Sequence, residues 1–190
     1  MAKLTSSPKH IAGVCSIIAI SVIAYLPAVD NFFISDDFTL FPMLQAAEQS
    51  PRWFFESTTE FFRLTSYLYF WACFKLFGLS PEPYYWSGIA LHALVSMLVY
   101  FLVLKITRRS LAAWAAAIFF AAYERHQEAV MWISAINETI LTLNCVIFVL
   151  LWRRAVERNS STDLVLAHVI FGIALFSKEA AVVLVPPGHA

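Results

Sequence analysis

Two adjacent aspartates, Asp36 and Asp37, form a concentrated acidic group in a strongly apolar sequence, shortly after its first membrane-length apolar run. Neighbouring carboxylates repel each other and must stay hydrated or be paired, so they are costly at a membrane boundary. They also raise each other's proton affinity, which suits a general base that removes a proton from a hydroxyl group. Consecutive loop residues point in different directions, so the second carboxylate could instead bind a cation or hold the reacting molecule.

The same pair also has a purely structural interpretation. Ser35 and Asp36 precede Phe38, and such residues before an apolar stretch are typical of the cap at a helix N-terminus. The residues alone leave both interpretations open.

A second polar group runs from Tyr123 to Glu128 between two apolar segments. One interpretation is a solvated hairpin loop. The other is a second wall of the same site, in which His126 and Glu128 bind an anionic headgroup or orient an acceptor.

Arg63 and Lys178 are candidates for binding a phosphate, because its oxygens require nearby positive charge and arginine can bind two of them at once. Each residue has an alternative interpretation. Arg63 could extend its charged end to the interface, and Lys178 could pair with Glu179. His92 lies inside an apolar segment, where a histidine usually forms a hydrogen bond with a neighbouring helix.

The composition is that of a membrane protein: 60% of the 190 residues are hydrophobic, 14% are charged and the formal net charge is zero. A chain without excess positive charge is not expected to bind nucleic acid, which needs a basic surface. The three cysteines lie in apolar runs without metal-binding spacing, so we interpret them as small buried hydrophobic residues.

The apolar runs predict an all-α fold, a polytopic bundle of transmembrane helices in a single domain over 1–190. The predicted spans are 11–28, 84–106, 110–123, 130–152 and 164–185. The first is interpreted as an uncleaved signal anchor. The last contains Lys178 and Glu179, so it is either one helix with a buried ion pair or, as we favour, two pieces that separate near Phe176.

The segment 64–79 decides the topology, because it is apolar but contains Lys75. Cytoplasmic loops are enriched in lysine and arginine. If 64–79 does not cross the membrane, one side receives all of the basic clusters, which contain Lys3, Lys9, Lys105, Arg108, Arg109, Arg153, Arg154 and Arg158. If it does cross, the later clusters move to the opposite side.

We therefore predict that 64–79 is an amphipathic interfacial helix within a long first extracytoplasmic loop, 29–83. Its apolar residues recur at helical spacing and form one stripe: Leu64, Tyr67, Leu68, Trp71, Phe74 and Phe77. The abrupt ending after 164–185 further predicts that the chain is a truncated part of a larger membrane enzyme.

Five short motifs then occur in a fixed order. They are Asp36-Asp37, Phe62-Arg63-Leu64, Leu91-His92-Ala93-Leu94, the group His126, Glu128, Ala129, Val130 and Trp132, and Ser177-Lys178-Glu179. This order resembles the N-terminal part of the GT-C membrane glycosyltransferases, in particular the protein O-mannosyltransferase-like and tetratricopeptide-associated branch. The family has a proline after the arginine of the second motif, and a His-Pro pair where Tyr123-Glu124 stand here.

The resemblance implies that Asp36 or Asp37 is the catalytic base and deprotonates the hydroxyl of a glycan or protein acceptor. The donor would be a sugar on a polyprenyl phosphate in the outer leaflet, and the phosphate would leave with inversion at the sugar. Substrate and lipid-phosphate binding would fall to Arg63, His126, Glu128, Lys178 and Glu179. Some branches bind a divalent metal, Mg or Mn, at the acidic motif and others do not, so a metal at Asp36 and Asp37 stays open.

A different class of function also fits the composition, namely a non-catalytic membrane protein such as a carrier, a scaffold or a flippase-like component. In either case we expect a multi-pass integral membrane protein in contact with the lipid bilayer. Tight loops and the lack of a retention signal favour a bacterial inner membrane over the endoplasmic reticulum.

Overall fold

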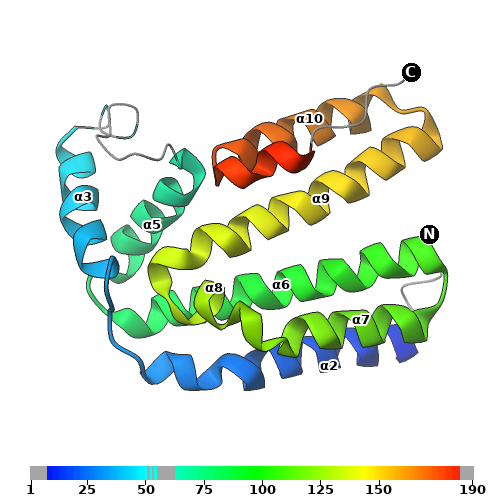
Figure 1. Ribbon diagram of the computed structural model, residues 1–190, viewed down its shortest axis with the longest axis horizontal. Coiled ribbons are helices and arrows are strands. Elements are labelled where there is room, and N and C mark those ends of the chain that lie inside the picture. Colours follow the sequence, from blue (N-terminus) through cyan, green and yellow to red (C-terminus); the bar gives the residue numbers. More distant parts are fainter. Residues whose placement is uncertain (1–7, 51, 53, 55–62, 185–190) are drawn as a thin grey trace.

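The structure is a computed structural model that describes residues 8–50, 52, 54 and 63–184 (Figure 1). The described residues contain helices and turns but no strand, which confirms the predicted all-α class. Predicted features that fall on 1–7, 51, 53, 55–62 and 185–190, such as Lys3 and Phe62, lie outside the described residues.

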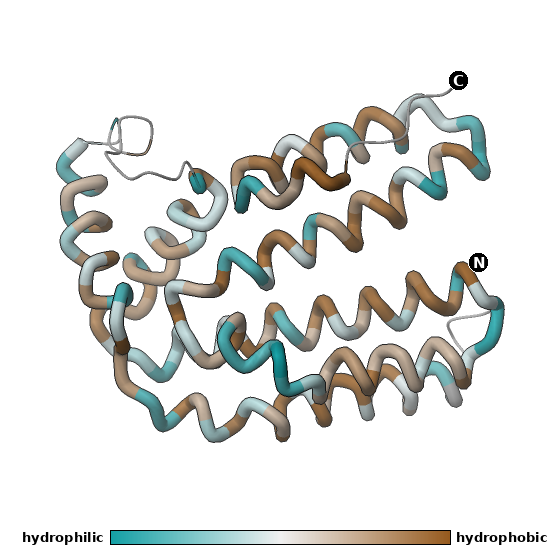
Figure 2. The backbone as a smooth tube through the Cα atoms, in the orientation of Figure 1, coloured by the Kyte–Doolittle hydropathy of each residue, from teal (hydrophilic) through white to brown (hydrophobic). Residues whose placement is uncertain are grey.

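Three helical segments are long and apolar enough to cross a membrane: His10–Asp30, Pro81–Thr107 and Ile133–Arg158. They contain α2 (Pro8–Tyr25) with the 3-10 helix η1 (Leu26–Asp30), α6 (Pro81–Thr107) and α9 (Ile136–Arg158). Two shorter apolar helices are α7 (Ser110–Ala122) and α10 (Ser161–Leu175). These helices identify a multi-pass integral membrane protein, and Figure 2 shows that they are mainly hydrophobic along their length.

The central helix is α6, which packs against α2, α7 and α9, while α10 packs along α9 (Figure 1). One face of α7 consists of Ala113, Ala117 and Ala121, all fully buried. Small side chains at this spacing let helices approach closely, which is a usual source of packing between membrane helices.

Two steeper helices, α3 (Asp37–Gln49) and α5 (Leu64–Phe77), stand beside each other at one end of the long helices (Figure 1). Buried aromatic residues join them to α6, among them Phe41, Phe70 and Tyr84. Much of the predicted stripe of α5 packs partly buried against this cluster, whereas Leu68 remains 45% exposed.

The helix predicted over 130–152 begins later than expected. Residues 127–135 form the short helix α8 (Gln127–Met131) and the 3-10 helix η3 (Ile133–Ala135), and α9 then starts at Ile136. Trp132 between them is extended, with φ −120° and ψ 114°, so an apolar stretch bends without any glycine or proline. The last predicted span is divided as favoured: α10 ends at Leu175, and the 3-10 helix η4 (Glu179–Leu184) follows.

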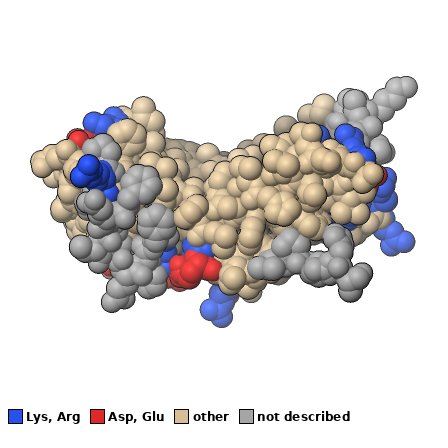
Figure 3. Space-filling view, turned by 90° about the horizontal axis from the view of Figure 1, so that it is seen from above, with Lys and Arg blue, Asp and Glu red and all other residues tan. Residues whose placement is uncertain are grey.

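The basic clusters at the ends of α6 and α9 meet at the opposite end of the bundle. Lys105 of α6 pairs with Glu157 of α9 at 3.4 Å, and His10 at the start of α2 forms a hydrogen bond with Tyr100 of α6. Figure 3, which views the molecule from above, shows charged side chains at both ends and a further acidic and basic group along the lower edge nearer the middle, with uncharged surface elsewhere. The segments that carry the candidate site residues, namely the starts of α3 and α5, the short helix α8 and the start of η4, lie away from these basic clusters (Figure 1).

Candidate functional site

Asp37 is fully buried and is held by three hydrogen bonds. Its carboxylate accepts from the backbone N–H of Ile34 at 3.0 Å, from that of Ser134 at 2.8 Å, and from the Ser134 hydroxyl. The bonds to Ser134 connect the start of α3 to η3, which is distant in the sequence. Charge-assisted bonds of this kind are stronger than neutral ones and compensate for burial of the carboxylate.

Asp36 has the opposite environment, because its side chain is exposed. It occupies the N-cap position of α3, as the structural interpretation of the sequence has it, although its side chain makes no capping hydrogen bond. Its backbone carbonyl instead accepts from the N–H groups of Thr39 and Leu40, at 3.0 and 3.1 Å. Ser35 precedes it in the left-handed conformation, with φ 48°, and turns the chain into the helix.

The Asp36 side chain borders a cavity of about 200 Å³, which we call the Asp36 cavity. Its walls come from α3, α5, η3 and the first turn of α9, and its polar lining includes Asp36, Arg63, Tyr67, Ser134 and Asn137. The cavity therefore combines a carboxylate that can accept a proton with a guanidinium that can bind an anion.

Arg63 forms a forked ion pair with Glu179 of η4. Its Nη2 donates to both carboxylate oxygens, at 3.0 and 3.3 Å, and its Nε donates at 3.4 Å. A hydrogen bond from its own backbone amide and the Arg63 guanidinium hold the pKa of Glu179 below its usual range. Arg63 thus already binds a two-oxygen anion in the geometry that a phosphate would need.

Lys178 pairs with Glu138 of α9, not with Glu179 as the alternative interpretation of the sequence had it. The preceding residues are also tied to their neighbours: Ser66 of α5 donates to the Ser177 carbonyl at 3.2 Å, and Thr65 N–H donates to the Phe176 carbonyl at 3.0 Å. The segment 176–179 therefore joins α5, α9 and α10.

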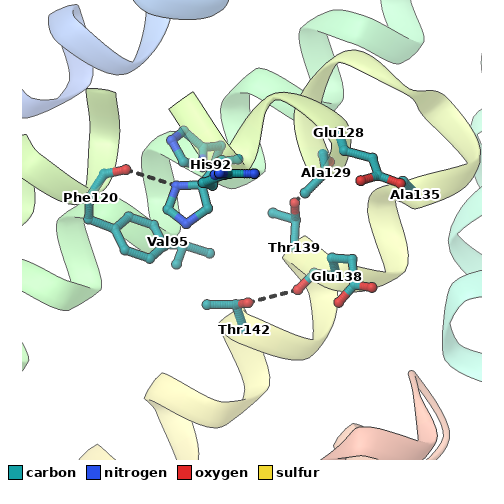
Figure 4. A pocket seen from close by; sticks show the side chains of 11 residues that line it. His92, Val95, Phe120, Glu128, Ala129, Ala135, Glu138, Thr139 and Thr142 are labelled. Atoms are coloured by element: carbon teal, nitrogen blue, oxygen red, sulfur yellow. Dashed lines mark hydrogen bonds between the residues drawn. The ribbon is translucent and has the colours of Figure 1, made fainter. Parts of the chain in front are cut away.

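A second cavity, of about 310 Å³, lies beyond α8, and we call it the His126 cavity (Figure 4). Residues that line it include His92, Arg125, His126, Glu128, Glu138 and Thr142. In Figure 4 the side chains of Glu128 and Glu138 lie on one side of the pocket, and those of Phe120 and Val95 on the other. The run before α8, with the 3-10 helix η2 (Glu124–His126), is among the most hydrophilic parts of the chain (Figure 2).

Both histidines of the His126 cavity are oriented by backbone carbonyls. His126 Nδ1 lies 3.0 Å from the carbonyl oxygen of Phe120, and His92 Nε2 lies 3.1 Å from that of Ala121. A carbonyl can only accept, so both ring nitrogens donate. The bond from His92 reaches the end of α7 and confirms the interpretation that this histidine binds a neighbouring helix.

The predicted site residues are thus divided between the two cavities by the segment 134–138. Ser134 and Asn137 face the Asp36 cavity, whereas Ala135 and Glu138 face the His126 cavity. Glu179 is connected to the Asp36 cavity through its ion pair with Arg63, and Lys178 to the His126 cavity through its ion pair with Glu138. Sequence reasoning missed Glu138, and the available signal was a charged residue inside a predicted apolar span.

The two aspartates lie in different environments, because the buried Asp37 carboxylate accepts three hydrogen bonds while the Asp36 side chain is exposed. Within the described ranges, no group of three or more histidine, cysteine, aspartate or glutamate side chains is placed to hold a metal ion.

The fold and the site define a class: a multi-pass membrane protein whose apolar helix bundle holds two cavities with charged linings. Residues 64–190 match the family described as dolichyl-phosphate-mannose-protein mannosyltransferase, so the chain belongs to this family of GT-C glycosyltransferases. The match begins at the first residue of α5 and covers the His126 cavity, but not the loop with Asp36. No curated protein and no solved structure matches the chain.

Proposed function

We propose that this chain carries the site of a membrane glycosyltransferase that moves mannose from a polyprenyl phosphate, such as dolichyl phosphate, to an acceptor hydroxyl. The family supports the reaction class and the donor. The observation that carries the assignment of the site is the Asp36 cavity, where an exposed carboxylate and an anion-binding arginine line one space.

In this proposal Asp36 takes the proton of the acceptor hydroxyl as its oxygen attacks the anomeric carbon of the sugar. The bond between this carbon and the phosphate oxygen breaks, its electron pair leaves with the lipid phosphate, and the configuration inverts. Arg63 exchanges Glu179 for the phosphate and stabilises its charge through the same two-oxygen geometry. Asp37 holds the loop that positions Asp36 and does not itself touch the reacting atoms.

We further propose that the end of the bundle carrying α3, α5 and the Asp36 cavity faces the extracytoplasmic side. The support is the charge distribution: Lys105 and Glu157 join the basic ends of α6 and α9 at the opposite end, where the positive-inside rule predicts the cytoplasm. α3 and α5 would then lie at the outer interface, beside the lipid headgroups.

Replacing Asp36 by asparagine tests the catalytic assignment. We expect mannose transfer from a labelled polyprenyl-phosphate donor, in membranes containing the full protein, to fall by roughly 10²–10⁴-fold, the usual contribution of a general base. Asp30→Asn is the matched control, because Asp30 is an exposed carboxylate shortly before the same loop. Full transfer by Asp36→Asn at normal protein levels would refute the assignment of the base, whereas no transfer by the unmodified protein would favour a non-catalytic membrane protein.

A further inference from the structure

We propose that the His126 cavity binds a sugar unit of the acceptor and does not bind the lipid phosphate. The inference rests on the proposed glycosyl transfer and names the class of its acceptor as a glycan or a glycosylated molecule. The side chains that line the cavity offer mainly hydrogen-bond acceptors, and this decides which ligands fit.

The histidines offer acceptors to a ligand. His126 uses Nδ1–H to bind the Phe120 carbonyl, and His92 uses Nε2–H to bind the Ala121 carbonyl. In a neutral imidazole the second nitrogen carries no hydrogen, so each ring has an acceptor left.

The two threonines that line the cavity also offer acceptors to a ligand. Thr139 donates its hydroxyl hydrogen to the Ala129 carbonyl at 3.1 Å, and Thr142 donates to the Glu138 carbonyl at 2.8 Å. Each hydroxyl hydrogen is therefore engaged, while the oxygen lone pairs remain able to accept.

The carboxylates add the strongest acceptors. Glu128 is exposed and its side chain has no hydrogen bond within the described part of the chain, and Glu138 has one oxygen engaged by Lys178. Arg125 is the lining side chain, among those described, that offers several donors. A ligand that fits this cavity must therefore supply more donors than acceptors.

A phosphate fails this requirement, because it offers mainly acceptors and would be repelled by the carboxylate of Glu128, whereas Glu138 is paired with Lys178. A sugar meets it, because each hydroxyl donates one hydrogen bond. The volume of about 310 Å³ is at the lower end of the range of about 300–1,000 Å³ for small-ligand sites.

The sugar in this cavity is not the one being transferred. The transferred sugar is bonded directly to the phosphate, which this account places at Arg63 in the Asp36 cavity. The segment 134–138 separates the two cavities, and a helix with its side chains is about 10 Å across. The bound sugar therefore belongs to the acceptor, which extends across this segment to present its hydroxyl to Asp36.

The test uses the purified full chain in nanodiscs and a panel of methyl glycosides of mannose, glucose, galactose and N-acetylglucosamine, detected by saturation-transfer NMR. We expect at least one glycoside to bind. Glu128→Ala should weaken that binding roughly tenfold, in line with the loss of hydrogen bonds to a charged group. Thr142→Val keeps the side-chain shape and should weaken it to a smaller extent.

Glu124→Ala is the matched control, because Glu124 is an exposed neighbour that does not line the cavity. Inorganic phosphate should not displace the glycoside. No binding by any glycoside, equal binding by Glu128→Ala and Glu124→Ala, or displacement by phosphate would each overturn the proposal. Asp36→Asn should leave glycoside binding unchanged, so failure of the catalytic assignment and failure of this inference give different results.

Discussion

The Asp36 cavity and the His126 cavity lie on either side of the segment 134–138, yet they offer opposite chemistry. The Asp36 cavity contains a carboxylate and a guanidinium that already binds two oxygens of Glu179. The His126 cavity contains mainly hydrogen-bond acceptors. The first is suited to proton transfer beside a phosphate and the second to a ligand rich in hydroxyl groups, so one segment, 134–138, separates two complementary sites.

The comparison also shows that residue type alone does not assign a role. Asp36 and Asp37 are adjacent and identical in type, but their surroundings differ. Asp37 is buried and bonded to Ser134, whereas the Asp36 side chain is exposed and borders a cavity. On this account the chemistry belongs to the residue whose carboxylate the fold leaves accessible.

The largest effect on folding should come from Asp37→Ala. The substitution leaves the backbone N–H groups of Ile34 and Ser134 and the Ser134 hydroxyl without their acceptor, so we expect a loss of roughly 3 kcal/mol in the free energy of unfolding. Unfolding of the purified protein in detergent, followed by tryptophan fluorescence, measures this loss.

Asp36→Ala provides the contrast, and we expect it to change the stability by no more than about 0.5 kcal/mol, as is usual for an exposed residue. Equal destabilisation by the two substitutions would mean that the aspartates do not differ as described. Asp37→Asn keeps one acceptor oxygen and should fall between them.

The sequence predicts much of the helical architecture, because apolar runs of sufficient length specify membrane helices. It also predicts the break after Leu175, since Lys178 and Glu179 are costly inside hydrocarbon. It does not predict the bend at Trp132, because the residues on both sides are mainly apolar and no glycine or proline marks it.

The division of the site residues could not be predicted either. It depends on contacts between distant segments, such as Arg63 with Glu179 and Lys178 with Glu138. Motifs identify which polar residues matter, but only the packing of α5, α9 and α10 determines which residues face the same cavity.

A smaller effect, confined to the donor, should follow from Arg63→Ala. We expect donor affinity to fall by about 10- to 100-fold, because hydrogen bonds to charged groups are worth roughly 1.5–3 kcal/mol. Binding of labelled polyprenyl-phosphate mannose to the protein in nanodiscs measures this change, and glycoside binding at the His126 cavity should not change. Parallel loss of both would show that the cavities are not separate sites.

The smallest effect should come from Glu179→Gln. The Glu179 side chain is 59% exposed, so the lost ion pair should reduce stability by less than about 1 kcal/mol. In the same donor-binding assay, the affinity of the Glu179→Gln protein for polyprenyl-phosphate mannose should stay equal or rise a few-fold, because a neutral Gln competes less strongly than Glu179 for Arg63. A marked fall would show that Glu179 contacts the donor instead of competing with its phosphate.

The most direct test of the account is the side of the membrane on which Asp36 lies. Ser35→Cys and Ser110→Cys introduce exposed cysteines at opposite ends of the bundle, in a background where Cys15, Cys73 and Cys145 are replaced by alanine. A membrane-impermeant maleimide applied to intact cells should label the cysteine at position 35, and should label the one at position 110 only after permeabilisation. Labelling of position 110 in intact cells, with position 35 protected until permeabilisation, would contradict the account.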